Sequence, residues 1–378
     1  MADSLTRRVL VIGGGASGNA VTILLRRAGL DVDLIEARPD WNATTGSGIT
    51  LQGNALRVLR ELGLWEQVEA SGFPFGTLGI TAPDGTVLHA AEDIQTGGDD
   101  LPATLGMQRP RLQQILIDAV RASGATVRLG TTTEALEQDA DGVSVRFSDG
   151  TEGRYDLVIA ADGLNSATRA AIGITEKPEP TGMAIWRIAA PRPEGVERTD
   201  LAYGGPAYIA GYTPTSENTI YAFLVEGCRE RASVDPADYA DEMRRLAQEY
   251  GGVWPEITKH ITDPEKVNYT WFNRMLVEGS WHRGRVVLLG DAAHCCPPTI
   301  AQGAAMSLED ALVLAELLTS GRDWDDALLQ SYYERRIPRV RTVVEASVQI
   351  GQWQLDGVRD ADVPGLIGGT MNSLKELP

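Results

Sequence analysis

The sequence is poor in the residues that build disulfide frameworks and metal sites. Its 378 residues include three cysteines and four histidines. Cys295 and Cys296 are neighbours, and because a disulfide between adjacent residues is badly strained, we expect free thiols and a reducing compartment. The sequence contains no CxxC pair and no histidine cluster at ligand spacing, so we expect no metal site.

Long apolar runs and an excess of positive charge are absent as well. No stretch of 18 or more apolar residues occurs, which argues against a transmembrane helix. The apolar residues 9–12 before the first glycines are too few for a secretory signal, so we expect a cytoplasmic protein without membrane contact. A nucleic-acid binder needs a basic surface, and the net charge of −18 therefore argues against a nucleic-acid partner.

What is present is the composition of a globular protein. Apolar residues make up 43% of the chain and charged residues 23%, which are ordinary values. At 378 residues the chain is long for one hydrophobic core, so we expect two structural parts.

Residues 8–36 predict a strand, a glycine turn, a helix and a second strand. The strands are the apolar stretches 8–12 and 32–36, and the helix covers about 19–28. A unit of this kind places its two strands parallel. The turn between the first strand and the helix is a GxGxxG motif with Gly13, Gly15 and Gly18.

This motif predicts a dinucleotide site. The glycines permit a tight turn, close approach of the backbone to a pyrophosphate and close helix–strand packing, and the helix N-terminus faces the phosphates. Glu36 ends the second strand, where its carboxylate would accept hydrogen bonds from the adenosine ribose and repel the 2′-phosphate of NADP. The motif alone leaves NAD and FAD open. The residues expected at this end of the nucleotide are Gly13, Gly15, Ala16, Ser17, Gly18, Glu36, Ala37 and Arg38.

Two further motifs follow apolar strands. Residues 162–169 read DGLNSATR after the strand 157–161, and residues 290–294 read GDAAH after the strand 286–289. The second of these is followed by Pro297, Pro298, Gln302 and Gly303. With the GxGxxG turn, this trio resembles the flavoprotein aromatic hydroxylases typified by p-hydroxybenzoate hydroxylase, a family of single-component monooxygenases. The resemblance spans roughly residues 7–345.

The resemblance implies FAD as the tightly held cofactor and suggests roles for individual residues. Asp291, after Gly290, would hydrogen-bond the ribityl chain, and Pro298 would lie along the isoalloxazine edge. The helix that opens at Gln302, Gly303, Ala304 and Ala305 would point backbone N–H groups at the flavin N1 and O2, where reduction places negative charge. Arg109 matches an arginine that contacts FAD, Asp162 and Gly163 match the pair near the pyrophosphate, and residues 46–49, with Gly48 and Ile49, match a glycine loop near the flavin.

Some positions depart from the family's pattern. The family commonly shows GQGxN where this chain has Ala301–Gln302–Gly303–Ala304–Ala305, so any role of the asparagine side chain is lost while the backbone contacts can survive. Ser17 and Asn19 replace the usual small and apolar residues in the first turn of the helix.

The fold class we predict is α/β, with a Rossmann-like FAD-binding domain, a mainly antiparallel substrate sheet and C-terminal helices. The predicted FAD domain is discontinuous and comprises residues 1–72, 100–177 and 268–378, and the substrate domain comprises 73–99 and 178–267. Residues 356–378 show no clear periodicity.

The substrate pocket is much less readable than the cofactor site. Arg187, Tyr203, Tyr212, Tyr221 and Pro298 are candidates for lining it, and no catalytic base is identifiable. We expect a structural role for His294, and Cys295 and Cys296 are expected to be small fillers near the flavin.

The function implied by the resemblance is hydroxylation of a small aromatic or heteroaromatic substrate. NAD(P)H would reduce FAD as a transient co-substrate, O₂ would add at the flavin C4a, and the hydroperoxide would transfer one oxygen. Epoxidation, Baeyer–Villiger insertion, plain dehydrogenation and a non-catalytic flavin-binding role remain alternatives, whereas a halogenase is disfavoured because no WxWxIP stretch is present. The substrate, the choice between NADH and NADPH, and the choice between monomer and homodimer stay open.

Overall fold

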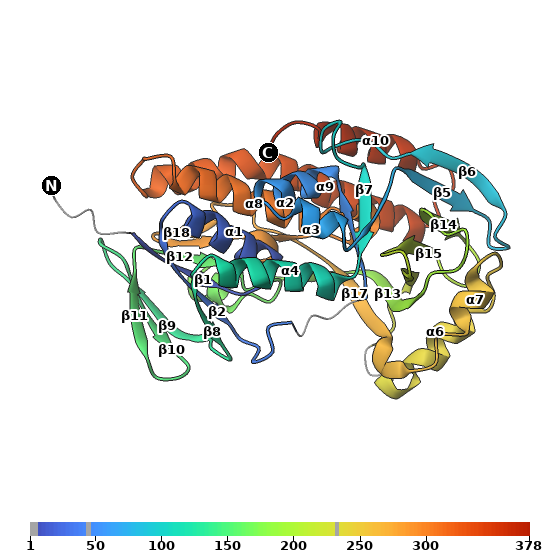
Figure 1. Cartoon of the computed structure of the whole chain (residues 1–378), viewed down its shortest axis with the longest axis horizontal. Coiled ribbons are helices and arrows are strands. Elements are labelled where there is room, and N and C mark those ends of the chain that lie inside the picture. Colours follow the sequence, from blue (N-terminus) through green and yellow to red (C-terminus); the bar gives the residue numbers. More distant parts are fainter. Residues whose placement is uncertain (1–6, 43–46, 231–233) are drawn as a thin grey trace.

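The computed structural model describes residues 7–42, 47–230 and 234–378. It shows a mixed α/β protein in which a parallel sheet with its helices occupies one end and a large antiparallel sheet the other (Figure 1). In this described part of the chain, no helix combines the length and hydropathy that crossing a bilayer requires.

The parallel sheet forms the centre of the first part. Its strand order is β18-β19-β12-β1-β2-β8, and all neighbours are parallel except β18 and β19. The strong apolar strand signals at 8–12, 32–36, 157–161 and 286–289 are confirmed as β1, β2, β12 and β19. The strands are β1 Arg8–Ile12, β2 Asp31–Glu36, β8 Thr126–Leu129, β12 Leu157–Ala160, β18 His282–Arg283 and β19 Val286–Leu288.

The two faces of this sheet are covered differently because side chains alternate along each strand. Val9 and Val11 face a helical layer, whereas Leu10 and Ile12 pack against a three-stranded sheet of order β11-β10-β9. The helices of the first part are α1 Ala16–Arg27, α2 Gly53–Glu61, α3 Trp65–Glu69, α4 Arg109–Ala122, α5 Ala167–Ala171, α8 Gly303–Leu318, α9 Asp326–Leu355 and α10 Val363–Ser373. The covering strands are β9 Thr133–Gln138, β10 Val143–Phe147 and β11 Glu152–Tyr155.

Helix α10 lies in the loosely patterned segment 356–378, where the sequence does not indicate the bounds of a helix. Pro364 and three glycines obscure its apolar pattern, yet Asp362 caps its N-terminus by accepting a hydrogen bond from the Gly365 N–H at 2.8 Å. The helix packs against α9, and Met371 and Leu374 are buried in the main core. Tertiary packing, more than local propensity, accounts for this helix.

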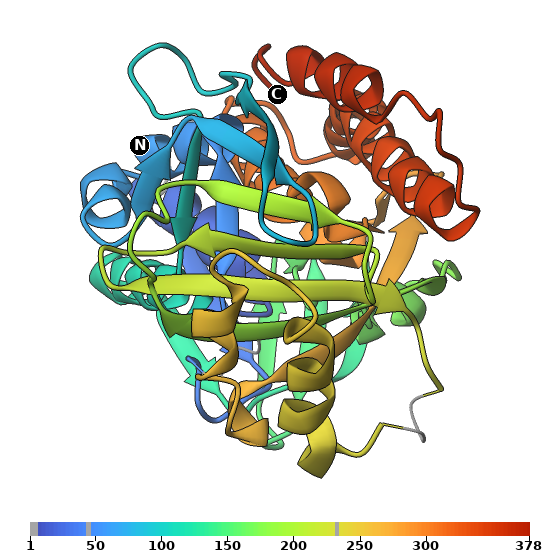
Figure 2. The ribbon, with the colours of Figure 1, turned by 90° about the vertical axis from the view of Figure 1, so that its right-hand side faces the viewer.

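The large sheet has the strand order β20-β17-β13-β16-β15-β14-β5-β6, and its pairs are antiparallel except β14 and β5. Helices α6 Tyr239–Ala247 and α7 Trp254–Thr258 cover one face, seen in front of the strands in Figure 2, and enclose a separate core around Trp186. We call this covered face the outer face and the opposite one the inner face. The strands are β5 Thr77–Thr81, β6 Val87–Glu92, β13 Glu179–Pro191, β14 Thr199–Tyr203, β15 Ile209–Pro214, β16 Thr219–Gly227, β17 Asn268–Leu276 and β20 His294–Cys295.

Two strands pair with strands of the other predicted domain. β17, placed with the FAD domain because it follows residue 267, pairs with β13 of the large sheet. β4, Phe73–Phe75, was placed with the substrate domain but pairs with β7, Thr104–Met107, which also pairs with β3, Ile49–Gln52. The division into domains stays a prediction.

Candidate active site

The three motifs follow the carboxyl ends of three neighbouring strands, β19, β12 and β1. The Leu289 N–H donates to the Ala160 carbonyl at 2.9 Å, and the Ala161 N–H donates to the Ile12 carbonyl at 2.8 Å. Because the carboxyl ends of parallel strands meet at one edge, the loops after residues 12, 161 and 289 lie side by side. The structure thus brings together segments that are far apart in the sequence.

The glycines of the first loop have different surroundings. A Cβ on Gly13, whose φ is +106°, would lie 2.3 Å from the Ala161 carbonyl oxygen, and one on Gly18 would lie 1.9 Å from the Gly13 oxygen. These two glycines are required by packing. A Cβ on Gly15 or on Gly163 would meet no other protein atom within 4 Å. Gly15 therefore leaves open space at the N-terminus of α1, where a side chain would intrude and a pyrophosphate fits.

The peptide groups around Gly14 are held by four side chains. Its N–H donates to Glu36 Oε2 at 2.8 Å. Its carbonyl accepts from Asn19 Nδ2 at 3.0 Å, Trp41 Nε1 at 2.9 Å and Gln113 Nε2 at 2.7 Å. Sequence reasoning missed these three donors, and no local signal identifies them. Together they fix the loop that is predicted to contact the nucleotide.

Glu36 lies at the end of β2 with Ala37 and Arg38 directly after it. Its second carboxylate oxygen, Oε1, accepts from the Arg38 N–H at 2.9 Å. This position beside the first loop is compatible with the predicted contact to a ribose, which stays a prediction.

In the second motif, the aspartate and the arginine stabilise the loop itself. Asp162 accepts from Ser166 Oγ at 2.5 Å and from the Thr168 N–H at 3.0 Å. The buried Arg169 donates to the Ala292 carbonyl at 3.0 Å, which ties this loop to the third motif. The predicted place of Asp162 near the pyrophosphate stays a prediction.

The third motif is packed tightly at its glycine and open at its aspartate. A Cβ on Gly290, with φ of +61°, would come within 2.9 Å of both Ser17 Oγ and Ser307 Oγ. Ser17, which departs from the family's pattern, thus packs against the third loop. Asp291 accepts from Ser307 Oγ at 3.3 Å and is exposed to water, yet burial raises its pKa. The Asp291 carboxylate is thus accessible to water although it is surrounded by protein, and we call the open space beside it the cleft.

Arg109 connects the flavin motifs to the large sheet. Burial lowers the pKa of this guanidinium, the nearby Asp291 carboxylate opposes that shift, and the positive charges of Arg187 and Arg38 add to it. Arg109 is nevertheless exposed to water, as Asp291 is. The predicted FAD-contacting arginine, the carboxylate of the third motif and the arginine of β13 therefore share one electrostatic environment.

The N-terminus of α8 is positioned by a strained residue and a buried amide. Among the described residues, Ala301 is the only non-glycine with a positive φ, at 54°. Such strain persists only where the surroundings impose it. Gln302 is fully buried, and its side chain exchanges hydrogen bonds with Asn54 at 2.9 and 3.2 Å instead of facing the cleft. The first backbone N–H groups of α8, on Gly303, Ala304 and Ala305, have no partner within the helix, and Pro298 is exposed just before them.

A buried network of charged side chains contacts both the loop of Asp291 and the start of α8, and sequence reasoning missed it. Asp310 accepts from His294 Nε2 at 2.6 Å, from the Gly290 N–H at 3.2 Å and from Arg336 Nε at 2.7 Å. Burial alone would raise the pKa of Asp310, but His294 and Arg336 outweigh it and lower that pKa. The expectation that His294 is structural agrees with this contact.

Glu309, beside Asp310 on α8, extends the network to the other loop. It lies 3.0 Å from Arg336 NH2 and accepts from Arg339 at 2.7 Å and from Asn54 Nδ2 at 3.1 Å. Since Asn54 also holds Gln302, the loop of Asp291 and the start of α8 are anchored to the same pair of acids.

The substrate-pocket candidates divide between the two faces of the large sheet. Arg187 and Tyr221 lie on the inner face, joined by a hydrogen bond of 3.1 Å from Arg187 Nε to the Tyr221 hydroxyl, and Tyr203 lies on the same face. A Cβ on Gly48 would lie 2.4 Å from the Tyr221 Cβ, so the glycine loop before Ile49 contacts this face. Gly46 lies outside the described residues. Tyr212 is on the outer face, where it packs against Trp254 and donates to Asp200 at 2.9 Å. It is not brought to the cleft.

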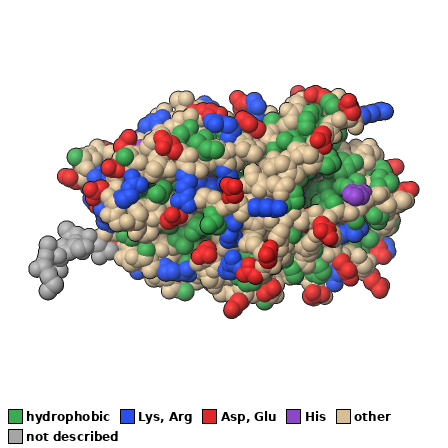
Figure 3. All heavy atoms as spheres, turned by 90° about the horizontal axis from the view of Figure 1, so that it is seen from above, with side chains coloured by type: hydrophobic (Ala, Val, Ile, Leu, Met, Phe, Trp, Pro, Cys, Tyr) green, Lys and Arg blue, Asp and Glu red, His purple; other side chains and the backbone are tan. Residues whose placement is uncertain are grey.

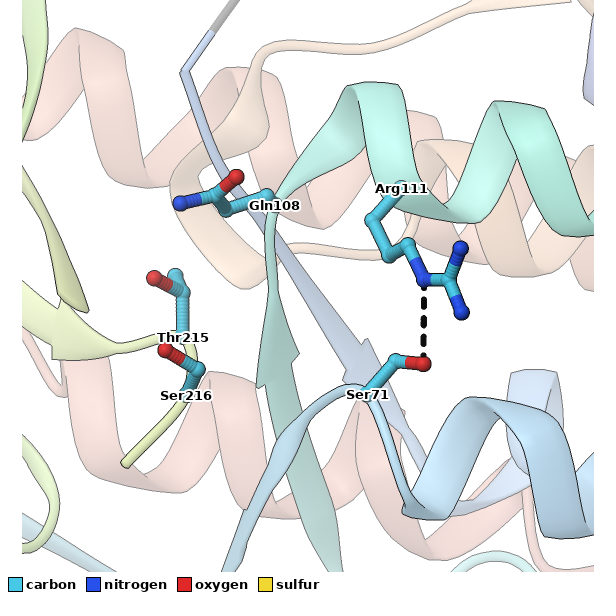
Figure 4. Close-up of a pocket in the computed structure, with 5 residues that line it drawn as sticks. All are labelled: Ser71, Gln108, Arg111, Thr215 and Ser216. Carbon is cyan, nitrogen blue, oxygen red and sulfur yellow. Dashed lines mark hydrogen bonds between the residues drawn. The ribbon is translucent and has the colours of Figure 1, made fainter. Parts of the chain in front are cut away.

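A small polar cavity lies at the junction of the two parts. It has a volume of about 230 Å³ and is lined by Ser71, Gln108, Arg111, Thr215 and Ser216. Figure 4 shows Arg111 Nε donating to Ser71 Oγ, at 3.1 Å, across from Gln108 and the turn at Thr215. Its polar lining and single cation do not match an aromatic ring, which needs an apolar wall.

The cysteines do not form a disulfide. Cys228, Cys295 and Cys296 are free thiols, and burial raises the pKa of Cys296 to about 12. That shift disfavours the reactive thiolate. In the described ranges, no cluster of three or more His, Cys, Asp or Glu side chains has the arrangement of a metal site.

Comparison with known proteins identifies relatives over nearly the whole chain. A family model described as "FAD binding domain" matches residues 6–347. The chain is 33% identical over 98% of its length to a putative FAD-dependent monooxygenase, YetM, of Bacillus subtilis, of which it covers 99%. It is 32% identical over 92% of its length to an aurachin C monooxygenase/isomerase of Stigmatella aurantiaca, of which it covers 90%. Among solved structures it resembles Klebsiella pneumoniae HpxO complexed with FAD and uric acid, with a TM-score of 0.84, 25% identity, and 97% of this chain and 96% of that one covered.

Proposed function

The chain belongs to the FAD-dependent aromatic hydroxylases, a family of monooxygenases, and we propose that it transfers one oxygen atom from O₂ to a heteroaromatic small molecule with NAD(P)H as reductant. The observation that carries this proposal is the contact of the glycine loop at Gly48 with Tyr221, where a Cβ would lie 2.4 Å from the Tyr221 Cβ, together with the hydrogen bond of 3.1 Å from Arg187 Nε to the Tyr221 hydroxyl. It joins the predicted flavin-binding loops to the inner face of the large sheet, so a ring held at Arg187 would lie next to the flavin.

The chain's own residues fit FAD. The open space at Gly15 and the N-terminus of α1 would accept the pyrophosphate, and the accessible Asp291 carboxylate would accept hydrogen bonds from the ribityl chain. The free N–H groups at the start of α8 would stabilise negative charge on the pyrimidine end of the ring. When bound, the flavin supplies the exchange of electrons with NAD(P)H and the activation of O₂.

The inner face of the large sheet would hold and orient the substrate. Arg187 donates to Tyr221 and to Thr270 Oγ1 at 2.5 Å, so its guanidinium is fixed in place. A fixed cation recognises a ring that carries an acidic or oxygen-rich group. A heteroaromatic ring is supported by HpxO, which was crystallised with uric acid. The sheet would also exclude bulk water from the reacting centre.

Turnover assays separate this proposal from the alternatives. We expect the purified, yellow protein to oxidise NAD(P)H faster when a suitable heteroaromatic is added, with O₂ uptake and a product 16 mass units heavier per oxygen atom gained. An ester or lactone product would indicate Baeyer–Villiger insertion, and an epoxide would indicate epoxidation. A product that has lost hydrogen without gaining oxygen would indicate dehydrogenation. If the bound flavin is not turned over with any combination of NADH or NADPH and a ring compound, the proposal that the protein is an enzyme is contradicted.

Asp291→Asn is expected to weaken FAD binding without destabilising the FAD-free protein. Loss of a charged hydrogen-bond acceptor costs about 1.5–3 kcal/mol, or roughly 10- to 100-fold in affinity. Burial raises the pKa of Asp291 in the folded protein, so the free energy of unfolding falls as pH rises from the unfolded pKa through the folded one. The asparagine side chain does not ionise, so the variant should not show this loss of stability. The measurements are FAD titration and thermal unfolding of the FAD-free proteins at pH 5 and pH 8. Equal FAD affinity in both proteins would contradict the assigned contact.

Arg187→Met is expected to lower kcat/KM for a ring with an acidic group by roughly 10- to 100-fold, while FAD stays bound. The reason is the loss of the one fixed cation that we place at the ring. Arg111→Met, in the polar cavity of Figure 4, is the matched control and should leave kcat/KM nearly unchanged. If Arg111→Met had the large effect and Arg187→Met none, the ring would have been placed in the wrong site.

A further inference from the structure

We propose that the substrate carries an apolar tail, which lies across the inner face of the large sheet and leads away from Arg187. This inference rests on the proposed function for the place of the ring, and it narrows the substrate class to an amphiphilic aromatic with an aliphatic chain.

Direct register partners form a continuous row across six strands. Arg187 pairs with Phe223, Phe223 with Gly211, Gly211 with Leu201, Leu201 with Ile80, and Ile80 with His89. Directly paired residues present their side chains on the same face of a sheet. We call these residues the cross-strand row: Arg187, Phe223, Gly211, Leu201, Ile80 and His89.

The composition of the cross-strand row is graded. A cation stands at the end near Arg109 and Asp291, and the next four positions carry no charge. At Gly211 a Cβ would lie 2.4 Å from the Phe223 ring and 2.8 Å from Leu201 Cδ2, so the ring and the leucine cover the glycine from both sides. The result is an apolar surface beside Arg187, with no side chain projecting at Gly211.

This surface remains accessible although it lies on central strands. Phe223, Leu201 and Ile80 are partly exposed, whereas their neighbours on the outer face, Leu224 and Ala202, are 0% and 3% exposed. The outer face is therefore filled by the protein's large separate core. On the inner face, Phe223 and Leu201 pack against a smaller buried cluster, which includes Ile185, Ile209 and Val225, but stay partly exposed. Figure 3 shows a hollow bordered by hydrophobic side chains on the side of the molecule that carries β6 and α10.

An aliphatic tail fits the row better than a second protein segment does. Four strand spacings of about 4.8 Å separate Arg187 from Ile80, so the row is about 19 Å long, and it starts at the place proposed for the ring. A charged group at one end only, next to the flavin motifs, suits an amphiphile whose ring is anchored at Arg187. Its tail would then lie over Phe223, Leu201 and Ile80.

The test uses the FAD-loaded protein and a series of 4-alkylbenzoates from methyl to nonyl. Binding is followed by the change in flavin absorption, which needs no turnover. Affinity should rise about fourfold for each added methylene, the fold-change that corresponds to about 0.8 kcal/mol per buried CH₂. Because an extended nonyl chain is shorter than the row, the rise should continue to the longest member of the series. Equal affinities along the series would overturn the proposal.

Variants locate the tail. Leu201→Gln should flatten the dependence on chain length, whereas Leu377→Gln, an exposed apolar residue at the C-terminus, should leave it unchanged. If Leu201→Gln does not fold, Ile80→Gln is used instead. An unchanged dependence of affinity on chain length in a folded variant would show that the tail does not lie on the cross-strand row.

The outcome is independent of the proposed reaction. A steep chain-length dependence without any ring that stimulates NAD(P)H oxidation would contradict the hydroxylase and support the tail. Tail-less heteroaromatics that are hydroxylated as efficiently as long-chain ones would support the hydroxylase and contradict the tail.

Discussion

Replacing Gly15 by valine is expected to give a folded, colourless protein that does not retain FAD. The backbone at Gly15 has φ −80° and ψ −170°, an extended conformation that valine adopts without strain, and its Cβ would meet no other protein atom within 4 Å. The fold should therefore tolerate the change. The valine side chain would instead occupy the space at the N-terminus of α1 that the pyrophosphate needs, and FAD affinity should fall by roughly 100-fold or more, about 2.7 kcal/mol.

Gly76→Val is the matched control. Gly76 is also exposed, and a Cβ there would likewise meet nothing within 4 Å, but it lies between β4 and β5, outside the three motif loops. Circular dichroism should show native secondary structure for both variants, and the flavin absorption of the purified proteins should be lost only in Gly15→Val. A yellow Gly15→Val protein with undiminished affinity would show that the pyrophosphate does not bind at this loop.

Arg336→Met is expected to produce the largest loss of stability. Arg336 is fully buried and pairs with both Glu309 and Asp310, which are themselves fully buried. Removing one partner of a buried ion pair leaves uncompensated charge in the interior and typically costs about 3–5 kcal/mol. Arg335→Met is the control, because the neighbouring arginine pairs with the exposed Glu316, and such a surface pair is worth about 0–1 kcal/mol. Equal urea midpoints for the two variants would contradict the importance of the network.

The same variant should change how stability depends on pH. The pKa of Asp310 is lowered in the folded protein, so its contribution is present above the unfolded pKa of about 3.9 and is lost as pH falls through the folded value. Without Arg336 that pKa should rise, and acid unfolding should begin at a higher pH than in the wild type. The measurement is the unfolding midpoint between pH 3 and pH 7. Because Asp310 also holds His294 and the Gly290 N–H, weaker FAD binding should accompany the shift.

The fold could be predicted wherever its signals are local. Four apolar runs, three of which end in glycine-containing turns, identified β1, β2, β12 and β19, because a buried parallel strand leaves a largely apolar stretch. The partner of a strand is a long-range property, however. Nothing within residues 268–276 tells that β17 joins β13, and nothing within 73–75 tells that β4 joins β7.

The candidate site shows the same division. The glycines and Asp291 were found because each occupies a defined place in a short motif. The ion pairs of Asp310 with His294 and Arg336 join residues 16 and 26 positions apart, and no motif records them. Tyr212 and Tyr221 look equivalent in the sequence, yet the register between β15 and β16 places them on opposite faces. Alternation along a strand is visible in the sequence, but the assignment of each face to core or cleft needs the tertiary structure.

The separate core under α6 and α7 has a consequence for how this protein can diverge. That core stabilises the large sheet from behind, while Phe223, Leu201 and Ile80 on its other side are only partly buried. New side chains at these three positions should therefore alter which molecules are accepted at small expense in folding free energy. Substitutions at these positions, natural or engineered, can change which molecules are recognised while the three motif loops stay as they are.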